Sequence, residues 1–279
     1  MIKRAKLCIC LMLIFLCGCV HSNHSKNPTS EPTMCSDHVE TSFTTPSPEK
    51  SPETTVPDLS LNVDNGAYLS TYNDENTGDY LDYYLFIPQN AEIGMPLVVF
   101  LHGDGQVGQP DSLESYGMIS EAREIFGERY PFITISPCTR SASWTDGTIP
   151  DTLKGLIDQT IQTYSIDPNR VIITGHSRGA MGVWYMISTY GTFFSAAVPV
   201  SCGASVQLDF DTCATVPVLA FVGDTGEYEY RYQVSMERII YCINESDGKA
   251  ELRILDNATH GETAQMAYTA EVFAWMLEQ

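Results

Sequence analysis

One serine of this sequence has a glycine two residues before it and another two residues after it. Ser177 is the centre of Gly175-His176-Ser177-Arg178-Gly179, which follows the apolar run 171–174. A strand that turns sharply into a helix strains the backbone at the corner, so the residues two places away must lack side chains. The N-terminus of the following helix favours developing negative charge. The spacing therefore predicts that Ser177 is a nucleophile and that the backbone N–H of Arg178 contributes to an oxyanion hole.

A nucleophilic serine also needs a second N–H donor and a histidine that takes its proton. The segment Leu-His-Gly-Asp-Gly at 101–105 follows an earlier apolar run, and we assign the backbone N–H of Asp104 as that donor. His260 comes after the last expected strand and is the expected general base. His102 and His176 lie beside glycines at strand ends, where a local hydrogen-bonding role is expected.

The elements that must hold these residues alternate along the chain. Short apolar runs bounded by turn residues predict strands at 80–87, 96–101, 132–135, 171–174, 196–200, 216–222 and 251–255. Apolar residues at helical spacing predict helices at 118–129, 151–164, 180–190, 233–244 and 263–277. The alternation predicts an α/β fold, with a mostly parallel twisted sheet and helices on both faces, in one domain spanning 60–279.

Four segments, taken in order, resemble a known superfamily. They are 101–105, Ser-Ala-Ser-Trp-Thr-Asp at 141–146, 175–179 and Thr-His-Gly at 259–261. They are similar to the α/β-hydrolases, and within these to feruloyl esterases, polyhydroxybutyrate depolymerases and bacterial lipoprotein carboxylesterases. The resemblance covers residues 80–279. It implies an α/β-hydrolase fold and a serine carboxylesterase that acts on feruloyl, acetyl or similar esters through an acyl-enzyme, a reaction that needs no metal or organic cofactor.

The resemblance also bears on two residues of the substrate cleft. Trp144 matches a position near the cleft, where it either stacks on an aromatic or sugar group or simply packs the loop. The superfamily members more often have methionine after the serine, where this chain has Arg178. That arginine would place a cation beside the site and favour carboxylated or phenolic substrates.

The acid that orients His260 is expected after the strand 216–222, because that strand end faces the histidine loop in this fold. The usual pattern is Gly-x-x-Asp, but Gly226 stands three residues after Gly223. Asp224 lies too close to the strand end, and Glu227 is displaced by one position, which the longer glutamate side chain partly makes up. We therefore favour Glu227 over Asp224, with Glu229 further along the chain. The alternative is that Asp224 and Glu227 are ordinary loop carboxylates.

The first 19 residues have the pattern of an export signal. A positive stub precedes an apolar run of about ten residues at 7–16, which is too short to span a bilayer comfortably. The run ends in Leu16-Cys17-Gly18-Cys19, which resembles a bacterial lipobox. We therefore expect a lipid on Cys19 and a location at the cell surface, the alternative being an ordinary signal peptide. Residues 20–59 are rich in Ser, Thr, Pro and Glu and are predicted to be a flexible tether.

Composition limits the partners. The formal net charge of −20 repels phosphate backbones, which argues against nucleic acid, while 43% hydrophobic residues are enough to build a core. The expected partner is a small-molecule or polysaccharide-linked ester, with membrane contact through the lipid only. Nine cysteines include four in the domain, whose spacing does not suggest zinc. Cys202 and Cys213 either form a disulfide or are buried thiols.

Two other functions fit the same fold. A serine peptidase would usually carry an extra propeller or lid domain, for which the domain leaves no room. A catalytically idle surface-binding module is disfavoured because the serine, the histidine and the oxyanion loop are all present.

Overall fold

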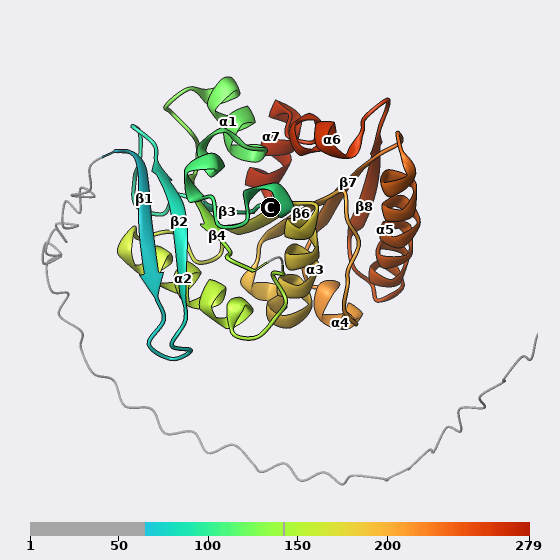
Figure 1. The fold of residues 1–279 in the computed structure, drawn as a ribbon, viewed down its shortest axis with the longest axis horizontal. Coiled ribbons are helices and arrows are strands. Elements are labelled where there is room, and N and C mark those ends of the chain that lie inside the picture. Colours follow the sequence, from blue (N-terminus) through green and yellow to red (C-terminus); the bar gives the residue numbers. More distant parts are fainter. Residues whose placement is uncertain (1–64, 142) are drawn as a thin grey trace, which may run out of the picture. The chain divides into compact units, whose positions relative to one another are not determined.

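The computed structural model describes residues 65–141 and 143–279, and within these ranges one sheet runs through the domain (Figure 1). Its strand order is β1-β2-β4-β3-β5-β6-β7-β8. The strands are β1 (Gly66–Asn73), β2 (Tyr80–Ile87), β3 (Leu97–Leu101), β4 (Ile133–Cys138), β5 (Val171–His176), β6 (Ala196–Val200), β7 (Val218–Gly223) and β8 (Ala250–Leu255). The first two strands are antiparallel to their neighbours and all other pairings are parallel. The predicted mostly parallel sheet is therefore confirmed.

Helices cover both faces of this sheet (Figure 1). Side chains of α1 (Met118–Phe126) and α7 (Ala270–Glu278) pack on one face. Those of α2 (Ile149–Thr163), α3 (Arg178–Tyr190) and α5 (Glu227–Glu245) pack on the other. The two short helices are α4 (Phe210–Cys213) and α6 (His260–Met266).

Strand β3 shows why its sequence is apolar throughout. Leu97, Val99 and Leu101 face the core under α2, α3 and α5, whereas Val98 and Phe100 face the core under α1 and α7. All five side chains are fully buried. A strand covered on both faces needs apolar residues at consecutive positions, as the uninterrupted run predicts.

Several elements differ from the sequence prediction, among them the short helix α4, where no helix was predicted. Strand β1 is additional, and its mostly exposed side chains explain why no apolar run marks it. The predicted helix 263–277 is two helices, α6 and α7. The predicted helix 233–244 begins six residues earlier, at Glu227. This early start has the largest consequence for the site, because it places Glu229, which the sequence prediction left in a loop, within α5.

The loops that follow β3, β5, β7 and β8 carry the predicted functional residues. Carboxyl ends of parallel strands lie at one edge of a sheet, where α/β folds place their ligands. Asp104 follows β3, Ser177 follows β5, and His260 follows β8. The fold therefore brings residues from distant parts of the chain to one edge.

Two further findings concern the described part of the chain. Its cysteines are free thiols, so the possible bridge between Cys202 and Cys213 is not formed, and both side chains are buried. Within the same ranges, no helix is both long and apolar enough to cross a bilayer. The predicted export signal, Cys19 and the predicted tether lie outside the described residues.

Candidate active site

Ser177 occupies a strained corner between β5 and α3. Its backbone has φ 58° and ψ −120°, a conformation that residues with a side chain rarely adopt. The Ser177 N–H donates a hydrogen bond of 2.9 Å to the carbonyl of Val200 in β6, which holds the corner in place. The corner thus has the backbone geometry that the glycine spacing predicts.

The flanking glycines are required by the close approach of α3 to the sheet. A Cβ atom at Gly179 would lie 1.9 Å from the carbonyl oxygen of Leu101 in β3. A Cβ atom at Gly175 would lie 2.7 Å from the carbonyl carbon of Gly179. Both distances are far inside van der Waals contact, so no larger residue fits at either position.

His260 connects the serine to a buried acid. Its Nε2 lies 2.9 Å from Oγ of Ser177, and its Nδ1 lies 2.6 Å from Oε1 of Glu229. His260 is the first residue of α6, whose start is fixed by reciprocal capping bonds between Thr259 and Glu262. Serine, histidine and carboxylate therefore form one hydrogen-bonded chain, the arrangement that activates a hydroxyl nucleophile.

Glu229 is fully buried and receives three hydrogen bonds. Besides His260, the hydroxyl of Ser201 donates to Oε2 at 2.8 Å and the N–H of Gly223 donates to it at 2.6 Å. Burial by itself would raise the pKa of this carboxyl, but the bonds from His260, Gly223 and Ser201 outweigh it and hold the pKa below its usual value. Glu229 therefore keeps its negative charge although it is buried in the protein interior.

The two acids predicted from the sequence do not contact His260. Glu227 is exposed and forms an ion pair with Arg231, one helical turn further on. Asp224 is exposed and accepts a hydrogen bond from the hydroxyl of Thr225. The prediction was wrong about geometry because α5 starts directly after Gly226, so its first turn carries Glu227 outward and Glu229 inward.

A sequence signal for Glu229 does exist. The buried residues of α5 are Glu229, Met236, Ile239 and Ile243. Their spacings of seven, three and four are those of the inward face of a helix. A lone acid on this apolar stripe needs a partner, and extending the helix back to Glu227 would have revealed it.

The loop after β3 lies against the serine and is held by buried groups. A Cβ atom at Gly103 would stand 3.2 Å from Cβ of Ser177. Nδ1 of His102 donates to the carbonyl of Gly103 at 2.6 Å, and Nε2 accepts from the N–H of Thr139 at 3.1 Å. Burial lowers the pKa of His102, which keeps this ring neutral. The local hydrogen-bonding role predicted for His102 is thus what the structure shows. Asp104 begins the 3-10 turn η1 (Asp104–Gln106) and lies in the same pocket as Ser177.

Trp144 packs against the same loop. Its side chain is 2% exposed, and its indole N–H donates to the carbonyl of His102 at 3.0 Å. The missing side chain of Gly182 in α3 makes room for it, since a Cβ atom there would lie 2.7 Å from Cβ of Trp144. Of the two roles left open by the sequence, packing of the loop is the one that these contacts describe.

Arg178 does not present an isolated cation to the site. Its guanidinium forms an ion pair with the carboxylate of Asp104, and both residues lie beside Ser177 in the same pocket. The positive charge expected to select carboxylated or phenolic substrates is therefore balanced by the neighbouring acid.

His176 and Tyr116 were not predicted to work together. Nε2 of His176 donates to the carbonyl of His260 at 2.8 Å, and its Nδ1 accepts from the hydroxyl of Tyr116 at 2.6 Å. Burial lowers the pKa of His176 to about 4, and the nearby His260 adds to this effect. A neutral imidazole thus ties the strand before Ser177 to the loop that carries His260.

Ser177 and His260 border a cavity of about 600 Å³. Its wall is made of Asp104, Ser143, Trp144, Thr145, Ser177, Arg178, Met181, Ser205, Tyr228, Tyr232 and His260. Across residues 65–141 and 143–279, no group of three or more His, Cys, Asp or Glu residues could hold a metal ion. The wall supplies a nucleophile and a base, and the buried Glu229 behind the base completes the set of groups that acyl transfer needs.

The chain is similar in sequence to known proteins. The chain is 27% identical over 155 residues to poly(3-hydroxyalkanoate) depolymerase C of Paucimonas lemoignei, covering 50% of this chain and 34% of the relative. It is 30% identical over 135 residues to acetylxylan esterase A of Emericella nidulans, covering 43% of each. The chain thus spans less than half the length of these curated relatives.

Solved structures give the same picture for the fold. The crystal structure of a thermostable esterase superposes with a TM-score of 0.66 at 25% identity, covering 76% of this chain and 63% of that one. The feruloyl esterase module from Clostridium thermocellum superposes with a TM-score of 0.57 at 16% identity, covering 78% and 91%. Residues 130–273 match the phospholipase/carboxylesterase family. The chain therefore has the α/β-hydrolase fold and belongs to the phospholipase/carboxylesterase family.

Proposed function

We propose that this protein is a serine carboxylesterase in which Ser177, His260 and Glu229 form the catalytic triad. The observation that carries the proposal is the unbroken chain of hydrogen bonds from Oγ of Ser177 through His260 to the buried carboxylate. His260 takes the serine proton as Oγ attacks the ester carbonyl, and Glu229 stabilises the imidazolium that forms. The family and the relatives named above support an ester as the bond that is cleaved.

The tetrahedral intermediate carries its negative charge on the former carbonyl oxygen. We assign the backbone N–H groups of Arg178 and Asp104 as its donors, one at the start of α3 and one at the start of η1. When the intermediate collapses, the carbon–oxygen bond to the alcohol breaks and His260 returns its proton to the leaving oxygen. Water, deprotonated by His260, then attacks the acyl carbon, and the bond from this carbon to Oγ of Ser177 breaks as His260 returns the proton to Oγ.

Labelling with a fluorophosphonate probe tests the mechanism. We expect the probe to label Ser177 and the Ser177→Ala variant to remain unlabelled, with hydrolysis of nitrophenyl acetate abolished and the circular dichroism spectrum unchanged. Undiminished hydrolysis by Ser177→Ala would overturn the proposal. A panel of feruloyl, acetyl-sugar and nitrophenyl esters of rising chain length would then identify the acyl group, for which feruloyl and acetyl are our candidates.

We also propose that the enzyme is an exported lipoprotein, held at the cell surface by a lipid on Cys19. The support is the order of charged stub, apolar run and lipobox-like Leu16-Cys17-Gly18-Cys19. In a detergent phase separation of expressing bacterial cells, we expect the wild-type protein in the detergent phase and Cys19→Ser in the aqueous phase. Cys17→Ser is the matched control and should behave like the wild type. Partition of the wild type into the aqueous phase would refute the anchor.

A further inference from the structure

The helix that carries Glu229 also brings two tyrosines beside His260. The ring centroid of Tyr232 lies 5.4 Å from that of His260, and the ring of Tyr228 lies 6.5 Å from it. The two tyrosines are one helical turn apart on α5, with ring planes 24° from parallel and centroids 6.4 Å apart. Both line the cavity. The early start of α5 therefore places aromatic surface next to the base as well as the acid.

The position of these rings assigns them to one half of the substrate. In the mechanism proposed above, His260 delivers its proton to the leaving alcohol oxygen, so the alcohol half of the ester lies beside His260. The carbonyl oxygen faces Arg178 and Asp104 instead. Tyr228 and Tyr232 thus border the alcohol side of the cavity.

Tyr232 is partly buried, whereas Tyr228 is exposed. Burial raises the pKa of Tyr232 to about 12, so its hydroxyl stays protonated, and its ring packs against the apolar core under α2, α3 and α5. Tyr228 is 66% exposed and offers its ring to whatever enters the cavity. A rigid aromatic wall beside an accessible aromatic face is suited to a ligand with a flat apolar side.

Hydroxyl groups stand near these rings. The loop after β6 packs closely against α5. A Cβ atom at Gly203 in this loop would collide with the hydroxyl oxygen of Ser235 in α5. The same loop carries Ser205, whose exposed side chain lines the cavity together with Ser143 and Thr145. The cavity therefore combines aromatic faces with hydroxyl donors and acceptors.

Charge narrows the class of alcohol. Arg178, a cation that lines the cavity, is balanced by Asp104, and the chain as a whole carries a formal charge of −20. An anionic alcohol such as a uronic acid would meet repulsion here. A neutral sugar ring, with C–H groups on its face and hydroxyls on its rim, matches both the aromatic and the polar lining.

We propose that Tyr228 and Tyr232 form the subsite for the alcohol half of the ester and that this alcohol is a neutral sugar. The inference rests on the proposed esterase function. It assigns substrate recognition to the first turns of α5, immediately beside the acid Glu229.

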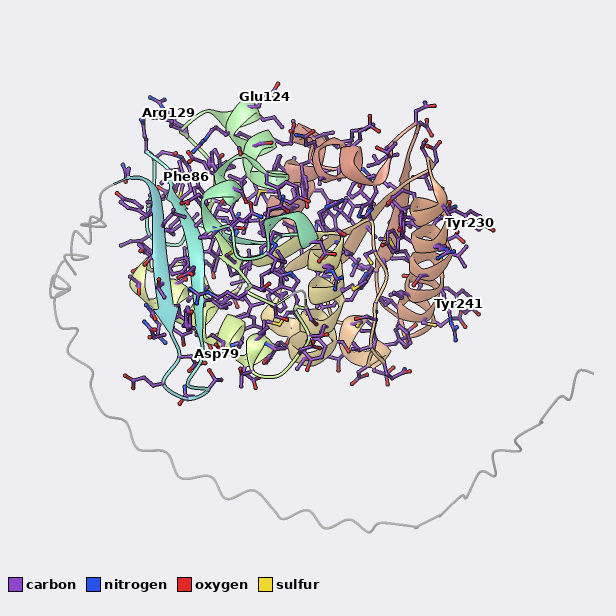
Figure 2. The ribbon with its side chains drawn as sticks, in the orientation of Figure 1. Asp79, Phe86, Glu124, Arg129, Tyr230 and Tyr241 are labelled. Atoms are coloured by element: carbon purple, nitrogen blue, oxygen red, sulfur yellow. The ribbon has the colours of Figure 1, made fainter. Side chains whose placement is uncertain are left out.

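Two acetate esters that differ only in the alcohol provide the test. An acetylated methyl xyloside and ethyl acetate form the same acetyl-enzyme, so a defect on the alcohol side changes the ratio of their kcat/KM values. We expect this ratio, sugar ester over ethyl acetate, to fall about tenfold in Tyr228→Ala and to recover in Tyr228→Phe, which keeps the ring. Tyr230→Ala is the matched control, since Tyr230 is 69% exposed, projects from the outer side of α5 and does not line the cavity (Figure 2).

Each other outcome overturns the inference. An unchanged ratio in Tyr228→Ala, or an equal fall in Tyr230→Ala, would show that the ring is not an alcohol subsite. A fall for phenyl acetate against ethyl acetate without a fall for the sugar ester would replace the sugar with an aryl alcohol. Failure of the esterase function itself gives a different result, because the wild type would then hydrolyse none of these esters, whether or not the fluorophosphonate probe labels Ser177.

Discussion

At the scale of single residues, Glu229 has an unusual set of partners for a helical acid. It is fully buried, yet its charge is held by donors from three separate segments: Ser201 after β6, Gly223 at the end of β7, and His260. The two donors on Oε2 fix which oxygen faces the histidine. Orientation of the acid is therefore built into the strand ends.

This geometry makes a sharp prediction for Glu229→Gln. The N–H of Gly223 and the hydroxyl of Ser201 will hold the amide oxygen, so the NH₂ group must face Nδ1 of His260. Nδ1 then accepts a hydrogen bond, the proton moves to Nε2, and the ring cannot take the proton of Ser177. We expect kcat to fall by about three to four orders of magnitude with little change in KM.

Glu227→Gln and Asp224→Asn are the matched controls for that variant. Both acids are exposed and neither contacts His260, so both variants should keep kcat within about twofold of the wild type. Steady-state kinetics of the three purified variants decide the matter. A collapse of kcat in Glu227→Gln with Glu229→Gln active would restore the acid favoured by the sequence.

Residues whose position depends on their neighbours in the chain could be predicted from the sequence, whereas a residue placed by a more distant feature could not. Ser177 and His260 were predictable because each sits in a short signature whose geometry depends on neighbours in the chain. The acid was not, because its place depends on where α5 begins. Gly226 has φ 103° and turns the chain straight into the helix, whereas the run of Tyr, Glu and Arg after it shows little apolar periodicity.

At the scale of elements, the contact between α3 and β3 is the tightest constraint around Ser177. The Cβ atom of Gly179→Ala would overlap the backbone carbonyl of Leu101, which cannot rotate away as a side chain would. We expect Gly179→Ala to lower the free energy of unfolding by at least about 3 kcal/mol, or to prevent folding. Chemical denaturation measures the loss.

Gly261→Ala is the control for this prediction. Gly261 lies in α6, and a Cβ atom there would meet no atom within 4 Å. Replacing a helical glycine with alanine removes backbone entropy from the unfolded chain, so this variant should be as stable as the wild type or more stable by up to about 1 kcal/mol. Equal losses in the two variants would show that the approach of α3 to β3 is not what requires glycine.

At the scale of the whole molecule, two effects act in opposite directions when the pH falls. The net charge favours the folded state as carboxylates are neutralised, whereas the buried histidines favour unfolding. The formal charge of −20 means that acidification relieves repulsion between carboxylates. His176 and His102, however, are buried and have lowered pKa values. Between pH 6.5 and about 4 the unfolded chain binds a proton at His176 that the folded protein does not.

The sign of this effect yields the last prediction. A lowered histidine pKa means that unfolding is favoured as the pH falls from 6.5 to about 4, at a total cost of about 3 kcal/mol for His176. Glu229 adds a separate loss at lower pH, as its carboxylate becomes protonated. Urea unfolding at several pH values should therefore show that His176→Gln, although less stable at pH 7, loses less stability than the wild type down to about pH 4. Parallel pH profiles for the two proteins would contradict a neutral His176, and the tie it makes between the Ser177 corner and the His260 loop would then have to involve its charged form.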